Sequence, residues 1–335
     1  MSAPPLVEAR DVVKHFRQPR RSLRQKPGIV HAVDGVSFEI RAGETFGLVG
    51  ESGCGKTTLG RLMLYLEPVT SGRLAVAGHD LARLSARAER DYRRSVQAVF
   101  QDPYGSLNPR QKVLEIVGEP ILAQERPGRA ALRERVRELL ALVGLPPGAE
   151  DLYPHEFSGG QRQRIAIARA ISVSPRFLVL DEAVSALDVS IRAQVLNLLK
   201  DLQERLDLTY LFIAHDLAVV EFMSDRVAVM YLGKIVETAP ARDIYSRPLH
   251  PYTQTLLRAA TATTPPKAVF RDVSLSGEVP SPINPPSGCR FRTRCPFAQA
   301  RCAEEEPLLR SAGGVQEGAH RAACHFFEEI AGHAA

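Results

Sequence analysis

Short apolar segments alternate along this chain with longer segments whose apolar residues recur every three to four positions. The short segments predict β-strands, because apolar residues either alternate with polar ones or run without a break; they lie at residues 6–13, 30–40, 45–49, 72–77, 176–183 and 209–215, with a hairpin at 226–237. The longer segments predict helices at 56–66, within 111–145, at 160–172 and around 190–206. Strands that alternate with helices are typical of a layered α/β core.

Two regions depart from this alternation. Residues 103–165 are mostly helical in pattern, and we expect a helical subdomain inserted into the core. Pro, Ser and Gly dominate 264–288, and four of the five cysteines fall in the last 47 residues. This tail has too little apolar content for a large core of its own. We therefore predict a core domain at 1–248 and a C-terminal extension at 249–335.

The composition of the chain indicates where the protein acts and which kinds of partner it could bind. The chain has 335 residues, 44% of them hydrophobic, and a net charge of +5, which fits nucleotide, phospholipid or nucleic acid without choosing among them. Its first residues, MSAPPLVEARDVVK, lack the apolar core of a signal peptide, and no stretch reaches 18 apolar residues. We expect a cytosolic protein or one peripheral to the cytosolic face of a membrane. Five basic residues within 17–26 predict a solvated loop or, alternatively, a contact with lipid headgroups or nucleotide.

A phosphate-binding pattern, G-x-x-x-x-G-K-[ST], occupies residues 50–57 between the apolar strand TFGLV and a predicted helix. Its glycines let the backbone wrap so that amide N–H groups point at phosphate oxygens, and the helix presents its positive end to the same anion. Lys56 would reach the β- and γ-phosphates of a nucleotide, and the hydroxyl of Thr57 would bind Mg²⁺. On these residues alone we predict a site for ATP or GTP. It comprises Gly50, Glu51, Ser52, Gly53, Cys54, Gly55, Lys56, Thr57 and Thr58, with Cys54 expected to act in packing.

Two carboxylates follow the apolar run FLVL at 177–180. Such a run predicts a buried parallel strand, and α/β sheets bind ligands at the carboxyl ends of their strands. Asp181 would hold Mg²⁺ through water, and Glu182 would polarise the attacking water. The alternative is that both acids cap the next helix, where carboxylates are favourable. The phosphate loop elsewhere in the chain favours the catalytic interpretation.

Phe157-Ser158-Gly159-Gly160-Gln161 resembles the signature motif of ABC ATPases, with Phe in the usual Leu position. Ser-Gly-Gly is also an ordinary turn, but here it stands between the phosphate loop and the acidic strand, as in that family. Its two glycines and the helix N-terminus would form a second anion site, to which Ser158 adds a hydroxyl donor.

Further elements of the family stand in the same order along the chain. They are the Q-loop glutamine Gln101, the D-loop Ser185-Ala186-Leu187-Asp188 and the switch histidine His215, although a lone histidine after a strand is more often structural. Ala183 departs from the family, which usually has proline after the acid pair, and we expect a looser turn there. Phe16 is the candidate aromatic residue that stacks on adenine.

The resemblance implies a P-loop NTPase (RecA-like) ABC ATPase core in the α/β class, with an inserted helical subdomain and a small cysteine-containing C-terminal extension. It also implies a head-to-tail dimer in which each ATP lies between one subunit's phosphate loop and the other's signature motif. The catalytic residues would be Glu182, His215 and Gln101, and Mg²⁺ would be held by Thr57, Gln101 and Asp181. The nucleotide site would also include Asp188 and the signature residues Ser158, Gly159, Gly160 and Gln161, which complete the partner's site.

A narrower resemblance covers roughly residues 6–326. HPYTQTLLRAA (250–260), GEVPSPINPPSGCRFRTRCPFAQARC (277–302) and FQDPYGSLNPR (100–110) are similar to ATP-binding subunits of bacterial dipeptide/oligopeptide permeases. Within that group, the N-terminal insertion and AVDGVSFEI (32–40) resemble the second, sister-pairing ATPase subunit. This implies an ATPase on the cytoplasmic face of the inner or plasma membrane that energises peptide import. Its partners would be a sister ATPase or a second copy of itself, two transmembrane permease subunits and, indirectly, an extracytoplasmic substrate-binding protein.

Other functions stay open beside this one. Nickel and other small-solute importers share much of the same pattern. A soluble ABC ATPase that acts on nucleic acid or ribosomes is another alternative, but such proteins usually carry two ATPase halves or a long coiled-coil insert. This chain has neither, so we expect no nucleic acid partner. A regulator that binds nucleotide without hydrolysing it is disfavoured by Glu182 and His215.

The last four cysteines, Cys289, Cys295, Cys302 and Cys324, have the spacing C-x5-C-x6-C-x21-C. This spacing matches neither a zinc ribbon nor a bacterial ferredoxin. In a reducing compartment such clustering suggests a metal before a disulfide, with unmetallated thiols and redox disulfides as alternatives. Four thiolates suit Zn²⁺ or an iron–sulfur cluster equally on count. The family resemblance favours a [4Fe–4S] cluster with a structural role, and Zn²⁺ is the runner-up.

Overall fold

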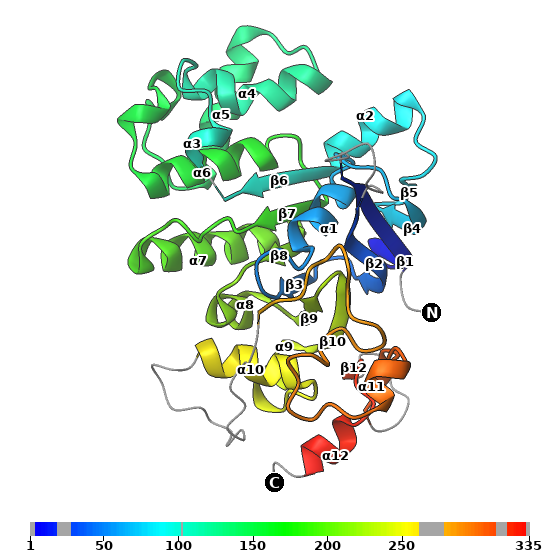
Figure 1. Ribbon diagram of the computed structural model, residues 1–335. Helices are drawn as coiled ribbons and strands as arrows, with labels where there is room; N and C mark the ends of the chain where they lie inside the picture. Colours follow the sequence, from blue (N-terminus) through cyan, green and yellow to red (C-terminus); the bar gives the residue numbers. More distant parts are fainter. Residues whose placement is uncertain (1–3, 19–27, 102, 261–277, 313–319, 333–335) are drawn as a thin grey trace. The chain divides into compact units, whose positions relative to one another are not determined.

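The computed structural model describes residues 4–18, 28–101, 103–260, 278–312 and 320–332, which form two compact units (Figure 1). The first unit contains Ala75–Ile213, with Ile40–Glu44 and the residues up to Val7. The second contains Glu8–Glu39, Thr45–Leu74 and the chain from Ala214 onward. Most of the basic segment 17–26 lies outside the described residues.

The first unit is built around three parallel strands, β6 (Val96–Phe100), β7 (Phe177–Asp181) and β8 (Thr209–Ile213). β7 lies between the other two and pairs with both. The four apolar residues of β7 and all of β8 are buried, as continuous apolar runs predict for strands covered on both faces. Because the strands are parallel, the residues that follow β6 and β7 lie at one edge of the sheet.

Helices make up most of the remainder of the first unit. They are α2 (Ala86–Ser95), α3 (Pro103–Ser106), α4 (Val113–Gln124), α5 (Arg129–Leu142), α6 (Gly159–Ile171) and α7 (Val189–Leu206). α4 and α5 both pack on α6, and buried Ile116, Val136 and Ile165 fill the space between them. The helical stretch expected within 111–145 is therefore two helices. The break falls at 125–128, where Pro127 and Gly128 disfavour helix.

The sheet of the second unit contains the strand that precedes the phosphate loop. That strand, β3 (Thr45–Val49), lies parallel to β9 (Arg226–Tyr231), which pairs antiparallel with β10 (Lys234–Pro240), so the hairpin expected at 226–237 forms. A second group of strands in this unit lies side by side in the order β2 (Ile29–Ile40), β1 (Val7–Arg17) and β4 (Ser71–Val76). The last two residues of β4 belong to the first unit, where they pair with β5 (His79–Asp80).

Two helices of the second unit belong to the core region, α1 (Lys56–Met63) and α8 (Leu217–Met223). α1 ends at Met63 rather than at residue 66, where it was expected to end. None of the helices in the described part of the chain combines the length and the apolar character that a membrane crossing requires.

The C-terminal tail continues the sheet of the second unit. Its elements are α10 (Pro251–Ala260), α11 (Arg301–Glu304), β11 (Arg310–Ser311), β12 (Arg321–Ala322) and α12 (Phe327–Gly332), and α9 (Ala241–Ser246) precedes it. β12 pairs antiparallel with β10, and β11 pairs with β12. The tail's own apolar cluster is small, and comprises Leu249, Ala322, Cys324, Phe327 and Ile330.

One buried carboxylate fastens this tail to the sheet. Glu237, on β10, accepts hydrogen bonds from the backbone N–H groups of Leu249 (2.7 Å) and His250 (2.9 Å). Its Oε1 also lies 2.5 Å from Nε2 of His320. A carboxylate without any exposure is stable only when its oxygens are satisfied in this way.

Candidate functional site

The phosphate loop follows β3 directly and ends where α1 begins at Lys56. Gly55 has a φ of +113°, and a Cβ atom there would lie 2.1 Å from the carbonyl oxygen of Ala32 on β2. A Cβ atom on Gly50 would lie 2.2 Å from the carbonyl oxygen of Met230 on β9. The loop is thus held against two backbone segments, and only glycine fits at either position.

Lys56 points into the concavity that this loop encloses. Its side chain is buried, and Nζ donates hydrogen bonds to the carbonyl oxygens of Gly50 (2.7 Å) and Glu51 (3.0 Å). Nζ also lies 3.7 Å from Sγ of Cys54, a buried thiol whose pKa is raised by burial. The carbonyl oxygen of Cys54 accepts from the N–H of Gly233 at 2.8 Å. A fixed positive charge inside a loop of backbone amides is suited to hold an anion such as a phosphate.

Glu51, the second residue of the loop, has partners in the C-terminal tail. Its carboxylate accepts two hydrogen bonds from the guanidinium of Arg294, at 2.7 and 3.0 Å. Its backbone N–H donates to the hydroxyl of Tyr252 at 2.8 Å. Sequence reasoning missed Arg294 and Tyr252, because both are more than 200 positions away along the chain and belong to no nucleotide-binding motif.

The structure brings Gln101, Asp181 and Glu182 to one edge of the parallel sheet. Asp181 is the last residue of β7 and lies opposite Phe100, so Gln101 follows immediately beside it. The backbone N–H of Glu182 donates to the carbonyl oxygen of Ile213 at 2.9 Å. Its φ is +51°, in the left-handed region, where a residue other than glycine costs about 1 kcal/mol or more.

The turn Ser158-Gly159-Gly160-Gln161 opens α6. Oγ of Ser158 accepts from the N–H of Gln161 at 3.3 Å, and Oε1 of Gln161 accepts from the N–H of Ser158 at 2.9 Å. This capping box holds the exposed N-terminus of a helix that spans 13 residues. A Cβ atom on Gly160 would lie 2.3 Å from Cγ2 of Ile191, on the first turn of α7. The turn is therefore packed against the segment that follows Asp188.

The remaining predicted residues lie in the second unit. His215 is exposed and stands two residues before α8, whose N-cap Asp216 accepts from the N–H of Ala218 at 3.0 Å. Phe16 is partly buried on β1, and Nζ of Lys14 lies 4.7 Å from the centre of its ring. The phosphate loop belongs to the second unit too. Gln101, Ser158–Gln161, Asp181, Glu182 and Asp188 belong to the first.

The tail gathers the four cysteines Cys289, Cys295, Cys302 and Cys324. The backbone N–H of Cys289 donates to the carbonyl oxygen of Cys302 at 2.8 Å. Burial and the three neighbouring cysteines raise the pKa of Cys295 to about 12. Burial, with Cys289 and Cys302 nearby, raises the pKa of Cys324 to about 11. Neighbouring thiols of this kind, two of them buried and two partly buried, are suited to a soft metal, which would bind them as thiolates.

Among the residues that the structure describes, the group of three metal-ligating atoms that lie within 4.8 Å of one another contains no cysteine.

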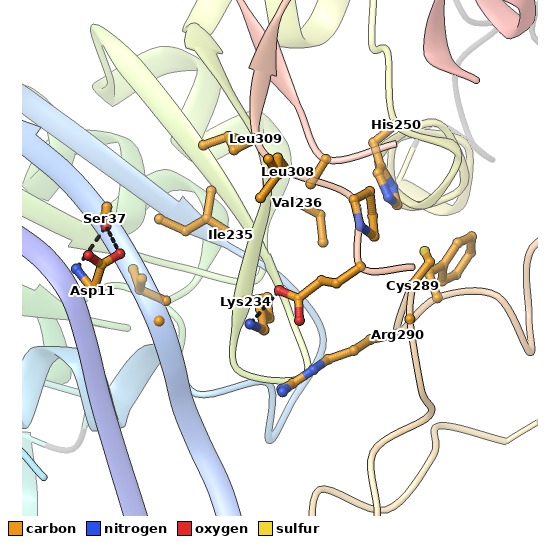
Figure 2. Close-up of a pocket in the computed structure, with 17 residues that line it drawn as sticks. Asp11, Ser37, Lys234, Ile235, Val236, His250, Cys289, Arg290, Leu308 and Leu309 are labelled. Carbon is orange, nitrogen blue, oxygen red and sulfur yellow. Dashed lines mark hydrogen bonds and ion pairs between the residues drawn. The ribbon is translucent and has the colours of Figure 1, made fainter. Parts of the chain in front are cut away.

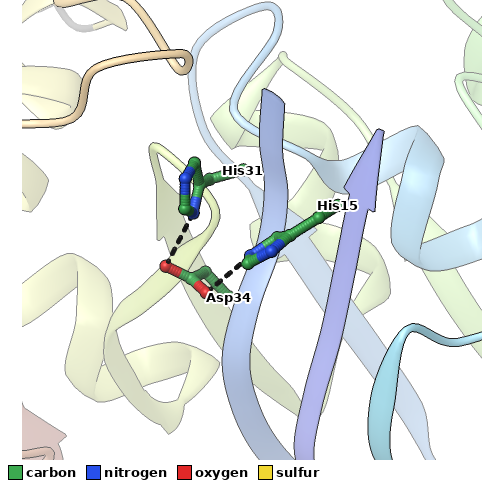
Figure 3. Close-up of side chains that lie close together, drawn as sticks. All are labelled: His15, His31 and Asp34. Carbon is green, nitrogen blue, oxygen red and sulfur yellow. Dashed lines mark hydrogen bonds and ion pairs between the residues drawn. The ribbon is translucent and has the colours of Figure 1, made fainter. Parts of the chain in front are cut away.

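A second group of metal-ligating side chains comprises His15, His31 and Asp34 (Figure 3). Nε2 of His15 lies 2.9 Å from Oδ1 of Asp34, and Nδ1 of His31 lies 3.5 Å from Oδ2. The guanidinium of Arg290 also pairs with this carboxylate. Burial acts to raise the pKa of Asp34, but the His15 hydrogen bond and the Arg290 charge outweigh it and hold that pKa below its usual range. Because Arg290 already neutralises Asp34, the group is better suited to structure than to binding a cation.

A hollow of about 220 Å³ lies between β10 and the cysteine segment (Figure 2). Its lining includes Ile235, Cys289 and Leu308, together with Lys234, whose Nζ lies 2.6 Å from Oε1 of Glu306. None of residues 50–58 lines it, so this hollow is separate from the phosphate loop.

Two family models match the chain. Residues 33–185 match the model described as ABC transporter, and residues 236–302 match the model described as oligopeptide/dipeptide transporter, C-terminal region. The chain is 49% identical over 324 residues to the oligopeptide transport ATP-binding protein AppF of Bacillus subtilis, covering 96% of this chain and 97% of that protein. It is 47% identical over 327 residues to the di/tripeptide transport ATP-binding protein DppF of Pseudomonas aeruginosa, covering 98% and 99%.

Solved structures share the fold. The dimeric, post-hydrolysis structure of the ATP-binding cassette MJ0796 bound to ADP and phosphate matches with a TM-score of 0.61 and 27% identity, covering 70% of this chain and 99% of that one. The structure of cbiO1 from Clostridium perfringens matches with a TM-score of 0.63 and 24% identity, covering 78% and 96%. The fold predicted for the core is thereby confirmed.

Proposed function

Because the chain belongs to the ATP-binding proteins of oligopeptide and dipeptide ABC transporters, we propose that it hydrolyses ATP to energise peptide import through separate membrane subunits. The observation that carries this proposal is the phosphate loop, with Lys56 buried inside it at the N-terminus of α1. The relatives, which are named for oligopeptide and di/tripeptide transport, support peptides as the cargo.

We assign the chemistry to the residues that the sequence predicts for the nucleotide site. The loop amides and Lys56 would bind the β- and γ-phosphates, and Phe16 would stack on the adenine. Bound Mg²⁺ neutralises charge on the phosphates, and the Thr57 hydroxyl, Asp181 and Gln101 would hold it. Glu182 would orient and polarise the attacking water, and His215 would contact the γ-phosphate. Catalysis in such a site rests on positioning and on electrostatic stabilisation.

A second subunit would complete the site. The turn at Ser158 exposes a helix N-terminus that suits an anion, and Asp188 and Val189 beside it are exposed, Val189 to 80%. We assign this surface to the ATP held by the partner's phosphate loop, where Ser158, Gly159, Gly160 and Gln161 would contact the γ-phosphate. The partner would be a sister ATPase or a second copy of the chain. ATP would close the dimer and hydrolysis would open it.

The membrane partners follow from the same assignment. Two transmembrane permease subunits would receive the chain on the cytoplasmic face of the membrane, and an extracytoplasmic binding protein would deliver the peptide. The alternatives are import of nickel or another small solute, and a soluble ATPase acting on nucleic acid or ribosomes. The match at 236–302 to the oligopeptide/dipeptide region favours peptides over both. Residues 1–248 would form the nucleotide-binding domain and 249–335 the extension that marks this transporter class.

The test is reconstitution of the chain with its membrane subunits in lipid vesicles. ATP hydrolysis should rise when the binding protein is loaded with a di- or oligopeptide, and the peptide should accumulate in the vesicles. Stimulation by nickel, or by RNA without membrane subunits, would contradict the peptide assignment. The matched control is the Lys56→Ala chain, which should assemble with the membrane subunits but bind no ATP.

For the cysteines, we propose a [4Fe–4S] cluster held by Cys289, Cys295, Cys302 and Cys324. Four neighbouring thiols, buried at Cys302 and Cys324 and partly buried at Cys289 and Cys295, support a soft metal there, and the family resemblance favours the cluster over Zn²⁺. The iron–sulfur cluster would cross-link the tail, whose own apolar core is small.

A further inference from the structure

We propose that Arg294 is a positioning residue for the phosphate loop: by neutralising and holding Glu51, it links the cysteine segment to the ATP site and raises the affinity for ATP. The proposal rests on the proposed ATPase function and names a residue that no nucleotide-binding motif contains. Arg294 and the loop both belong to the second unit.

The contact between Arg294 and Glu51 is bidentate and nearly dry. The guanidinium donates to both carboxylate oxygens, at 2.7 and 3.0 Å, and the Arg294 side chain is only 5% exposed. Bidentate pairs of this kind fix geometry as well as charge.

Glu51 transmits this contact to the phosphate site. Its carbonyl oxygen accepts from Nζ of Lys56 at 3.0 Å, and from the N–H of Cys54 at 3.3 Å. The position of the Glu51 backbone therefore helps to fix the position of Lys56, the lysine expected to bind phosphate. In addition, a bare carboxylate in this loop would repel a triphosphate, and the Arg294 charge removes that repulsion.

Arg294 is itself held in place by contacts within the C-terminal tail. Its backbone N–H donates to the carbonyl oxygen of Phe291 at 2.9 Å, and it immediately precedes Cys295. The ring of Phe291 is buried against Tyr231 and Tyr252, with centroids 5.3 and 5.4 Å away. Tyr252 in turn accepts a hydrogen bond from the N–H of Glu51. The aromatic cluster and the ion pair thus connect the cysteine segment to one residue of the loop by two routes.

The test measures Mg·ATP binding to the full-length chain by calorimetry, with its metal content and unfolding midpoint measured alongside. We expect R294Q to weaken ATP binding about ten-fold, because it leaves a carboxylate unpaired beside the phosphates. The double variant E51Q/R294Q should bind ATP more tightly than R294Q alone, because the unpaired charge is gone. R294K keeps the positive charge but cannot make the bidentate contact, so its affinity for ATP should lie between those of R294Q and the wild type.

A matched control lies on the same segment. The guanidinium of Arg292 donates to Ser287, through bonds of 2.9 and 3.3 Å, and not to the phosphate loop, so R292Q should bind ATP as the wild type does. If Arg294 had a purely structural role, the affinity for ATP would not recover in E51Q/R294Q, and that result would overturn the proposal. Wild-type affinity in R294Q would overturn it too. If the wild-type chain bound no ATP, the proposed ATPase function itself would be wrong.

Discussion

The backbone N–H of Glu182 donates to the carbonyl oxygen of Ile213 at 2.9 Å, across the step from β7 to β8. This bond, together with the φ of +51°, turns the chain sharply after the strand and fixes where the Glu182 side chain leaves the sheet. The hydroxyl of Ser185 donates to the Glu182 carbonyl oxygen at 2.9 Å and holds the other side of the turn. Ala183, where the family usually has proline, is buried within it.

Replacing Glu182 by Gln should separate binding from turnover. The amide keeps the shape of the side chain but cannot polarise water, so phosphate release should fall by at least about 100-fold while ATP affinity is kept. Parallel assays of phosphate release and nucleotide binding would measure this. The control is Glu204→Gln on the exposed face of α7, which should leave both unchanged. Persistent phosphate release in Glu182→Gln would show that the role given to this residue is wrong.

Replacing Gly160 by Ala should destabilise the fold of the signature turn. The new methyl group would meet Ile191 Cγ2 at 2.3 Å, and such overpacking costs about 1–3 kcal/mol. Gly159→Ala is the matched control, because its nearest neighbour, Cδ2 of Leu187, would lie 3.9 Å away. Urea unfolding of the two variants would compare them. Adding Ile191→Ala to Gly160→Ala should restore part of the loss, and a failure to do so would contradict the steric explanation.

His250 should make the stability of the tail depend on pH. Its Nδ1 accepts from the N–H of Tyr252 at 3.1 Å, which requires a neutral ring nitrogen, and burial lowers the pKa of His250 to about 4. In the unfolded chain the pKa is about 6.5, so as the pH falls the unfolded state takes up the proton first. The free energy of unfolding should therefore decrease between about pH 6.5 and pH 4, by on the order of 2–3 kcal/mol.

Chemical denaturation at several pH values would measure this contribution. His250→Asn should be less stable at pH 7 but should lose this part of the pH dependence. His155→Asn, at an exposed position in the first unit, should keep it. If the free energy of unfolding depended on pH equally in His250→Asn and in the wild type, the role given to His250 would be wrong.

The cysteine cluster predicts a coloured protein. Chain purified without oxygen should absorb broadly in the visible range and contain iron and inorganic sulfide. Cys295→Ser should lose most of the absorbance, iron and sulfide, because it removes one of the four proposed ligands. Cys54→Ala, in the phosphate loop, should keep the colour. A colourless chain that carries zinc would exclude the iron–sulfur cluster.

Motifs made of neighbouring residues could be predicted from the sequence, together with the strands and helices that flank them. The loop at 50–57, the acidic pair after β7 and the capped turn at Ser158 each form where their strand and helix patterns indicate. These depend on neighbouring residues, whose backbone preferences act directly. The break in the helical stretch at 125–128 was missed because apolar periodicity continues on both sides of it.

Contacts between distant segments could not be predicted. Glu51 and Arg294 are 243 positions apart, and nothing in either segment indicates the other. The anchoring of the tail by Glu237 was missed for the same reason, since a lone acid in a strand pattern usually faces solvent. Their pairing is decided by packing of the whole unit, which a single sequence does not report.

The pairing of β12 with β10 has a consequence for shortened forms of the chain. Without Arg321 and Ala322, β10 has an open strand edge. An open edge is a template for pairing with another copy of the same strand. We therefore expect chains truncated before Arg321 to self-associate, as size-exclusion chromatography would show.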